Sequence, residues 1–318
     1  MIKEQVIIGI DTSNYTTSVA LLGLDGRLIA NEKILLEVKP GERGLRQSEA
    51  LFNHTVNLPM IMKNIEQSLV GKEIVAVGVS SRPRNQDGSY MPCFLAGVSA
   101  AQSIASTLGV PFYRFSHQCG HIMAAIYSSG QYDLLDGRFA AFHISGGTTE
   151  LVHVCVGENG FDADIVGETA DLNAGQVIDR VGVYIGLPFP AGPSLEKEAL
   201  KNTSLIPKKK ISIKDMRINL SGLENLAIKL FDESGNVSLT SAFVLDYIGR
   251  AILRLMEDYE QKYGKSRFLC AGGVMSNSII KKMLSEKFEV YCAEPALSSD
   301  NAVGIAALTL REYKSELK

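Results

Sequence analysis

The chain has 318 residues, of which 46% are hydrophobic and 21% charged, and its formal net charge at pH 7 is −3. This length and composition predict a globular protein with a sizeable core, organised as two domains or one bilobal unit. They exclude a strongly basic nucleic-acid-binding protein, although a local basic patch remains open. No apolar run reaches the length of about 18 residues that a membrane span needs, and the N-terminus lacks the cleavage site of a signal peptide.

Two stretches far apart in the chain follow the same plan. The first begins with strands predicted over residues 6–10 and 18–22, and an Asp-Gly hairpin turn leads into a third strand. The second contains strands predicted over residues 139–144, 150–156 and 161–166. This similarity indicates a diverged internal repeat at the scale of a domain.

Each copy contains a polar turn between its first two strands. The turns are Asp11–Asn14, with Thr16 and Thr17 after it, and Ser145–Thr149. Backbone N–H groups and hydroxyls in such turns can bind a phosphate, and two turns facing each other would hold it from both sides. The alternative is two unrelated hairpins that use common turn residues.

Helical and irregular segments separate and follow these copies. Apolar residues at helical spacing predict helices over residues 49–69, 94–109, 241–264, 278–288 and 298–317.

Three further segments have other patterns. Residues 110–115 predict a short strand, residues 166–187 a glycine-containing loop followed by a helix, and residues 266–277 a strand that runs into a glycine turn. Residues 201–219 are the most loop-like and most basic part of the chain, and their three consecutive lysines are typical of a solvated face.

His117 and His121 are four residues apart in the sequence SHQCGH. Residues at this spacing share one face of a helix, so both imidazoles could reach one metal ion. Ser116 is compatible with a helix that begins at the first histidine. Two half-buried, hydrogen-bonded histidines without a metal are the alternative.

The five cysteines are scattered and never in CxxC spacing. This pattern predicts reduced thiols and a cytoplasmic location rather than a disulfide framework or a cysteine-type zinc site. Most of the cysteines are expected in the core.

The ordered set of motifs resembles the tRNA N6-adenosine threonylcarbamoyltransferase family over nearly the whole chain. The motifs are IDTSNYTTSVAL, HQCGHIMAA, SGGTTELV, GETADLNAGQVIDRVG, LPFPAGP, NLSGL, AGGVMSN and SSDNA. The resemblance implies the actin/Hsp70/sugar-kinase fold, an α/β fold with two related lobes that each hold a mixed sheet flanked by helices. The N-terminal lobe would span residues 1–130, completed by the helix at 300–318, and residues 131–299 would form the C-terminal lobe with the nucleotide-binding loops.

The resemblance also implies the site residues. His117, His121 and Asp300 would hold one divalent metal, iron or zinc, between which the sequence does not decide. Asp11 and Asn14 would be catalytic. The residues implied for nucleotide and substrate binding are Ser145, Gly146, Gly147, Thr148, Asp179, Gly192 and Asn277. Among these, Asp179 would bind the ribose hydroxyls, or would be an ordinary surface residue of its helix.

The chain departs from the family pattern at several positions near these motifs. Cys119 stands where the family has the middle acid of its histidine motif, Thr148 replaces a histidine, Gln176 an acid and Glu224 a lysine. The first polar turn has Tyr15 and Thr16 in place of acidic residues, and SSRPRNQDGSYMP replaces a Gly-Pro-Gly turn. Fewer acids and one histidine fewer would reduce the candidates for a general base.

The implied reaction is a metal-dependent transfer of a threonylcarbamoyl group from threonylcarbamoyl-AMP to N6 of adenosine in tRNA. The implied partners are tRNA, a homologous non-catalytic subunit, a small ATPase and a second copy in a homodimer, with no membrane. An alternative is a paralogue that binds metal and adenine nucleotide but acts on another substrate or serves as a non-catalytic subunit. A metallopeptidase is disfavoured, because HQCGH lacks the glutamate that HExxH enzymes use as general base.

Overall fold

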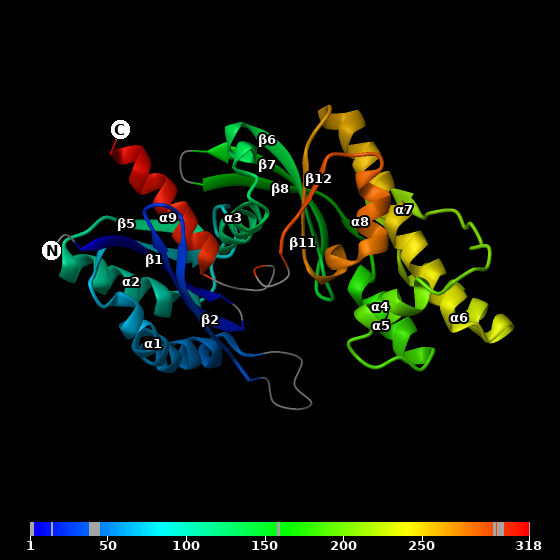
Figure 1. Ribbon diagram of the computed structural model, residues 1–318, viewed down its shortest axis with the longest axis horizontal. Coiled ribbons are helices and arrows are strands. Elements are labelled where there is room, and N and C mark those ends of the chain that lie inside the picture. Colours follow the sequence, from blue (N-terminus) through cyan, green and yellow to red (C-terminus); the bar gives the residue numbers. More distant parts are fainter. Residues whose placement is uncertain are drawn as a thin grey trace. The chain divides into compact units, whose positions relative to one another are not determined.

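The computed structural model describes residues 3–13, 15–37, 45–157, 160–294, 297 and 302–317. Its internal contacts divide the chain into two compact units (Figure 1). Unit 1 comprises Met1–Tyr132, Val156–Ala163 and Ala296–Lys318, and unit 2 comprises Asp133–Cys155 and Asp164–Pro295. Among the helices of the described residues, none is long and apolar enough to cross a membrane.

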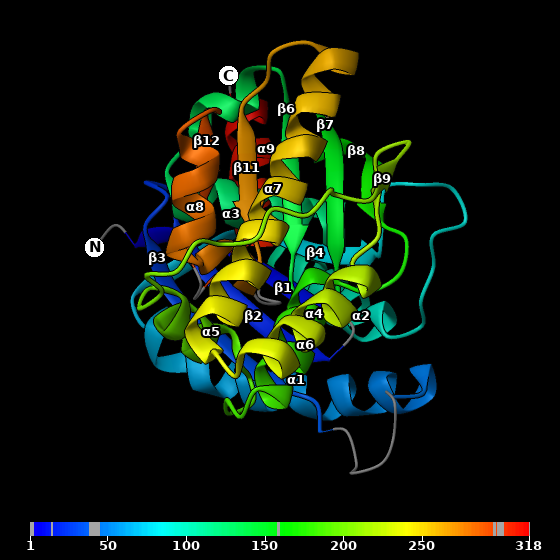
Figure 2. The same cartoon turned by 90° about the vertical axis from the view of Figure 1, so that its right-hand side faces the viewer.

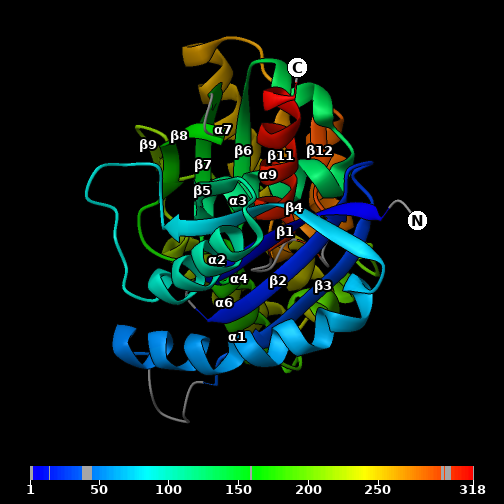
Figure 3. The ribbon, with the colours of Figure 1, turned by 90° about the vertical axis from the view of Figure 1, so that its left-hand side faces the viewer.

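Unit 1 contains a five-stranded mixed sheet in the order β3-β2-β1-β4-β5 (Figure 3). Its strands are β1 (Glu4–Ser13), β2 (Thr16–Gly23), β3 (Leu28–Leu35), β4 (Lys72–Arg82) and β5 (Phe112–Ser116). The first three strands pair antiparallel, whereas β4 pairs parallel with both β1 and β5.

Four helices accompany this sheet: α1 (Gln47–Leu69), α2 (Phe94–Leu108), α3 (His117–Ser129) and α9 (Val303–Glu316). Side chains alternate along β1, so Ile8 packs in one cluster with residues of α1 and α2, whereas Ile7 packs with Leu310 of α9. A Cβ on Gly9 would lie 2.8 Å from the Cα of Ala306, so α9 rests directly on the sheet. The C-terminal helix therefore completes the unit that the N-terminal strands begin.

A seven-stranded sheet in the order β12-β11-β6-β7-β8-β10-β9 belongs to unit 2, except for the end of β7 and the start of β8, which lie within Val156–Ala163 of unit 1. The strands are β6 (Arg138–Ile144), β7 (Thr149–Gly157), β8 (Gly160–Thr169), β9 (Ile213–Lys214), β10 (Arg217–Ile218), β11 (Phe268–Ala271) and β12 (Val290–Cys292). The helices are α4 (Ala174–Tyr184), α5 (Gly192–Ala199), α6 (Ser221–Ser234), α7 (Val237–Tyr263) and α8 (Ser278–Ser285). Helices α7 and α8 lie in front of the sheet in Figure 2. The helices share one core with the sheet residues Phe142 and Phe268.

The two sheets repeat one strand order. The order β3-β2-β1-β4-β5 in unit 1 corresponds to β8-β7-β6-β11-β12 in unit 2. In unit 1, β1 pairs antiparallel with β2 and parallel with β4, and in unit 2, β6 pairs antiparallel with β7 and parallel with β11. The predicted internal repeat is therefore confirmed. The short strands β9 and β10, from the segment predicted as a loop, extend the sheet of unit 2 beyond the repeat.

Some element boundaries differ from the prediction. Residues 166–169 belong to β8 and not to a loop, because β10 supplies Glu168 and Thr169 with a neighbouring strand. Helix α7 begins at Val237, four residues before the predicted start, because the side chain of Asn236 accepts a hydrogen bond from the N–H of Leu239 and caps the helix there.

Candidate functional site

The histidine pair lies at the start of α3, in unit 1. Ser116 precedes the helix, and its Oγ accepts a hydrogen bond of 3.2 Å from the N–H of Cys119. This cap places His117 in the first turn and His121 one turn later on the same face. Their Nε2 atoms are 2.8 Å apart, so the two imidazoles converge as the spacing predicts.

Asp11 lies behind this pair, at the end of β1, and is 1% exposed. Its Oδ2 is 3.0 Å from Nδ1 of His117 and accepts a hydrogen bond of 2.9 Å from Ser13 Oγ, while Ser80 Oγ donates to Oδ1. A carboxylate beside Nδ1 favours the tautomer with its proton on that nitrogen. The lone pair of Nε2 then points toward His121, the orientation that a metal-binding histidine needs.

These residues fit part of a metal site. Two imidazole nitrogens oriented by a carboxylate suit zinc or iron. However, the described residues contain no group of three or more His, Cys, Asp or Glu that could hold a metal ion. The predicted third ligand, Asp300, and the predicted catalytic residue Asn14 both lie outside the described residues.

Hydroxyls of the first polar turn are bound by the protein itself. Thr12 Oγ1 donates to the carbonyl oxygen of Cys93 at 3.2 Å and accepts from the N–H of Gly97 at 3.1 Å, so it fixes the start of α2. Thr17 Oγ1 lies 2.8 Å from Nδ1 of His54 on α1. Both threonines are fully buried. The prediction that their hydroxyls hold a phosphate is therefore wrong: they connect the sheet to its helices.

The second polar turn connects β6 to β7 in unit 2. Ser145 closes it, because its N–H donates to the carbonyl oxygen of Thr148 at 2.8 Å and its Oγ accepts from the N–H groups of Gly147 and Thr148. A Cβ on Gly146 or Gly147 would meet no atom within 4 Å, so the turn has open space beside it. A Cβ on Gly175 would lie 2.6 Å from the nitrogen of Gly146, so the start of α4 rests on the turn.

A cavity of about 310 Å³ opens beside this turn within unit 2. Four of the seven residues predicted for nucleotide binding line it: Gly146, Asp179, Gly192 and Asn277. The other three form the adjoining turn. The remaining lining residues are Gly175, Ile178, Pro190, Pro193, Glu196, Gly273, Val274 and Ser276. Its size and mainly apolar or glycine lining, with few polar groups, are typical of a small-ligand site.

Polar side chains of the cavity are held by backbone groups. Oδ1 of Asp179 accepts a hydrogen bond of 2.7 Å from the N–H of Ala191. Oδ1 of Asn277 caps α8, which leaves its amide N–H₂ group as a donor. Oε1 of Glu196 accepts from the N–H of Ser278 at 2.8 Å. The sequence did not predict Glu196 as a lining residue, because a single charged residue on a short helix has no distinctive pattern. Gly175, another lining residue, lies within the motif GETADLNAGQVIDRVG.

Comparison with known proteins decides the family. The family model described as tRNA N6-adenosine threonylcarbamoyltransferase matches residues 29–307. A Streptococcus suis protein of that name is 31% identical over 99% of this chain and 95% of its own length. The chain belongs to the tRNA N6-adenosine threonylcarbamoyltransferase family.

Solved structures with low sequence identity show the same fold. The activator of 2-hydroxyisocaproyl-CoA dehydratase from Clostridium difficile, solved with bound ADPNP, has a TM-score of 0.52 at 13% identity and covers 98% of this chain and 97% of its own. A Streptococcus pneumoniae ROK family protein has a TM-score of 0.50 at 11% identity and covers 98% of this chain and 99% of its own. The predicted actin/Hsp70/sugar-kinase fold is confirmed.

Cys119 explains one departure from the family pattern in structural terms. The residue is 1% exposed, and its Sγ donates to the carbonyl oxygen of Phe161 at 3.2 Å. Burial raises the pKa of its thiol, so Cys119 is neutral at physiological pH. The position therefore contributes packing and no charge beside the histidines.

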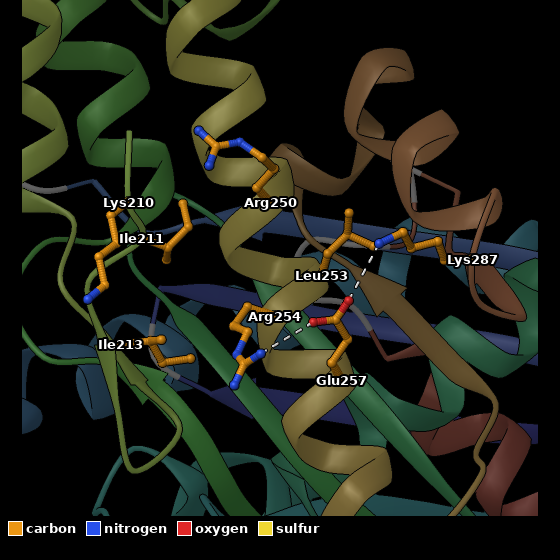
Figure 4. Close-up of a pocket in the computed structure, with 8 residues that line it drawn as sticks. All are labelled: Lys210, Ile211, Ile213, Arg250, Leu253, Arg254, Glu257 and Lys287. Atoms are coloured by element: carbon orange, nitrogen blue, oxygen red, sulfur yellow. Dashed lines mark ion pairs between the residues drawn. The ribbon is translucent and has the colours of Figure 1, made fainter. Parts of the chain in front are cut away.

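A second depression of unit 2, of about 420 Å³, lies between α7 and the chain before β9 (Figure 4). We refer to it as the basic groove. Its lining residues are Lys210, Ile211, Ile213, Arg250, Leu253, Arg254, Glu257 and Lys287. Arg254 and Lys287 pair with Glu257 at 3.7 Å and 3.5 Å, while Arg250 pairs with Asp246 at 2.8 Å and Arg254 also with Asp258 at 3.1 Å. Of the three consecutive lysines, Lys210 lines this groove, together with Arg250 and Arg254 of α7 and with Lys287, which follows α8.

Proposed function

We propose that this chain transfers a threonylcarbamoyl group from threonylcarbamoyl-AMP to N6 of adenosine in tRNA. Membership of the family supports a transferase that acts on tRNA. The observation that carries the finer assignment is the glycine-lined cavity of unit 2, which collects Gly146, Asp179, Gly192 and Asn277 from four separate segments.

Each part of an adenylate has a suitable partner in this cavity. Gly192 and Gly273 lack side chains, and a Cβ on either would meet no atom within 4 Å, so a flat base can approach the backbone closely. The carboxylate of Asp179 would accept hydrogen bonds from the ribose hydroxyls. The turn would offer the N–H of Gly146 to a phosphate. The neighbouring N–H groups already have acceptors, because Gly147 and Thr148 donate to Ser145 Oγ, Ala174 to Thr149 Oγ1 and Gly175 to the carbonyl oxygen of Ser145.

We further propose one divalent metal, iron or zinc, held by His117, His121 and Asp300. Gly304 of α9 lies directly against Gly120, between the two histidines in sequence, and Asp300 precedes α9 by three residues. When bound, the metal would polarise the acyl donor. Asp11 would position His117 rather than transfer protons, because three donors already engage its buried carboxylate.

The reaction balances without an external oxidant or reductant. The N6 nitrogen of adenosine attacks the carbonyl carbon of the acyl donor, a carbon–nitrogen bond forms, and the bond between that carbon and the phosphate oxygen breaks. AMP leaves with the electron pair, and N6 releases one proton. We also propose that Asn14, which the family resemblance implies, is a catalytic residue in this transfer.

The basic groove is proposed to contact RNA phosphates. Its four lining cations would be the groups that contact phosphates, although Arg250, Arg254 and Lys287 would have to exchange their ion pairs with Asp246, Asp258 and Glu257. The other proposed partners are a homologous non-catalytic subunit, a small ATPase and a second copy of the chain. The proposed location is the cytoplasm.

A transfer assay tests the function. The purified chain, with and without partner subunits, would receive threonylcarbamoyl-AMP and unmodified tRNA, and the tRNA nucleosides would be analysed by mass spectrometry. Modified adenosine is expected, and Asp179→Asn should reduce its formation. Nucleotide and metal binding without any transfer would instead favour the paralogue that acts on another substrate.

A further inference from the structure

Two of the five cysteines face each other in unit 2. Cys270 lies one residue before the end of β11 and Cys292 ends β12, and the parallel register of these strands makes the two residues direct partners. Neighbouring strands lie about 4.8 Å apart. This separation falls inside the range of about 4.4–6.8 Å between the Cα atoms of disulfide-bonded cysteines.

The two thiols differ in access and in acidity. Cys270 is fully buried, whereas Cys292 is partly exposed. A hydrogen bond from Cys270 lowers the pKa of Cys292 to about 7 against the effect of burial, and the ammonium group of Lys281 lowers it further. Hydrogen bonding to Cys292, together with burial, raises the pKa of Cys270 well above its ordinary value. One partner is thus an accessible nucleophile and the other a protected thiol beside it, which is the arrangement of an attacking and a resolving cysteine.

The pair is connected to the cavity by a short and tightly held segment. The N–H of Ala293 donates to the carbonyl oxygen of Cys270 at 2.8 Å. Gly272, two residues after Cys270, adopts φ +98°, and any Cβ there would overlap the carbonyl oxygen of Ile144. Gly273, Val274 and Ser276, which follow directly in the chain, line the cavity. Because Gly272 is packed tightly against Ile144, a shift of Cys270 toward β12 would also displace the neighbouring residues that line the cavity.

We propose that Cys270 and Cys292 are a redox modification site, which forms a reversible disulfide with a small-molecule disulfide as oxidant and thereby weakens ligand binding in the adjoining cavity. The Cys292 thiolate attacks one sulfur of the oxidant, a mixed disulfide forms, and one thiolate leaves. Cys270 then loses its proton and attacks Sγ of Cys292, the mixed bond breaks, and the second thiolate leaves. Two thiols are oxidised and one disulfide is reduced to two thiols.

The test uses the full chain, equilibrated without oxygen in buffers of oxidised and reduced glutathione at graded ratios. After acid quenching and alkylation, peptide mass spectrometry identifies each cysteine. We expect a crosslinked peptide with Cys270 and Cys292 that disappears as the buffer becomes reducing. In Cys270→Ser, Cys292 should stop at the glutathione adduct, and in Cys292→Ser the buried Cys270 should stay reduced. The exposed Cys155 is the internal control, and Cys155→Ser should leave the crosslink unchanged.

Two results would overturn the modification site: both thiols reduced at every ratio, or a glutathione adduct on Cys292 that never resolves in the unchanged chain. The effect on the cavity rests on the proposed adenylate binding and has its own measurement, AMP binding by calorimetry. Oxidation should weaken it about tenfold, and equal affinities would refute the connection. A reduced protein that binds no AMP would contradict the proposed function and leave the crosslinking result standing.

Discussion

Replacing Asp11 by Asn tests whether this residue orients a metal-binding imidazole. Asn keeps one acceptor oxygen and replaces the other with an N–H₂ group. The amide nitrogen should occupy the Oδ1 position, because the hydroxyl of Ser80 can turn and accept from it, whereas Nδ1–H of His117 cannot. The bond to His117 therefore survives, but it is no longer charge-assisted.

The magnitude follows from this one change. Hydrogen bonds to charged groups contribute about 1.5–3 kcal/mol, and neutral ones about 0.5–1.5 kcal/mol. The midpoints of these ranges differ by about 1.25 kcal/mol, which corresponds to a loss of metal affinity of about eightfold. Asp11→Ala, which removes the acceptor completely, should lower the affinity by up to about 100-fold.

Calorimetric titration of the metal-free protein with Zn²⁺, and with Fe²⁺ in the absence of oxygen, measures this effect. Ser13→Ala is the matched control, because it removes a donor to the same carboxylate oxygen and leaves the bond with His117. Ser13→Ala should change the free energy of metal binding by less than about 1 kcal/mol. If Asp11→Asn bound metal as tightly as the unchanged chain, the positioning role would be wrong.

Three further changes test other parts of the structure. Gly272→Ala should lower the free energy of unfolding by about 2–4 kcal/mol, through strain at positive φ and overlap with β6, as measured by urea denaturation. Cys119→Glu should cost at least about 3 kcal/mol in the same assay, because a carboxylate would be buried where the thiol now donates one hydrogen bond. Lys210→Gln combined with Lys287→Gln should weaken tRNA binding and reduce the slope of log affinity against log salt by about 1.5, as measured by fluorescence anisotropy.

Each of these changes has a control in the same chain. Gly273→Ala places its methyl in open space and should leave unfolding nearly unchanged. Cys119→Ser retains the donor and should cost much less than the glutamate. Lys314→Gln, on the exposed end of α9, should leave the salt dependence unaltered, and an equal effect there would show that the basic groove has no special role.

Local patterns in the sequence predicted much of the fold. Apolar strand-like runs and the polar turns between them indicated the repeated strands, and the cap at Ser116 with histidines four apart predicted one helix face. Such features depend on hydrogen bonds and side-chain spacing within one or two turns, so a short window of sequence contains the necessary information. Boundaries such as the end of β8 required the neighbouring strand and could not be read locally.

Only the tertiary structure brought distant residues together. Asp11 and His117 are 106 positions apart, and nothing in either local sequence shows that one orients the other. The threonines of the first turn looked suited to phosphate, but helices that pack on the sheet use their hydroxyls instead. Likewise, Cys270 and Cys292 became partners only through the register of two parallel strands. The sequence by itself determined the family and the repeat; packing between distant segments decided which of the candidate site residues face each other, because that depends on strand register and helix contacts that no single segment contains.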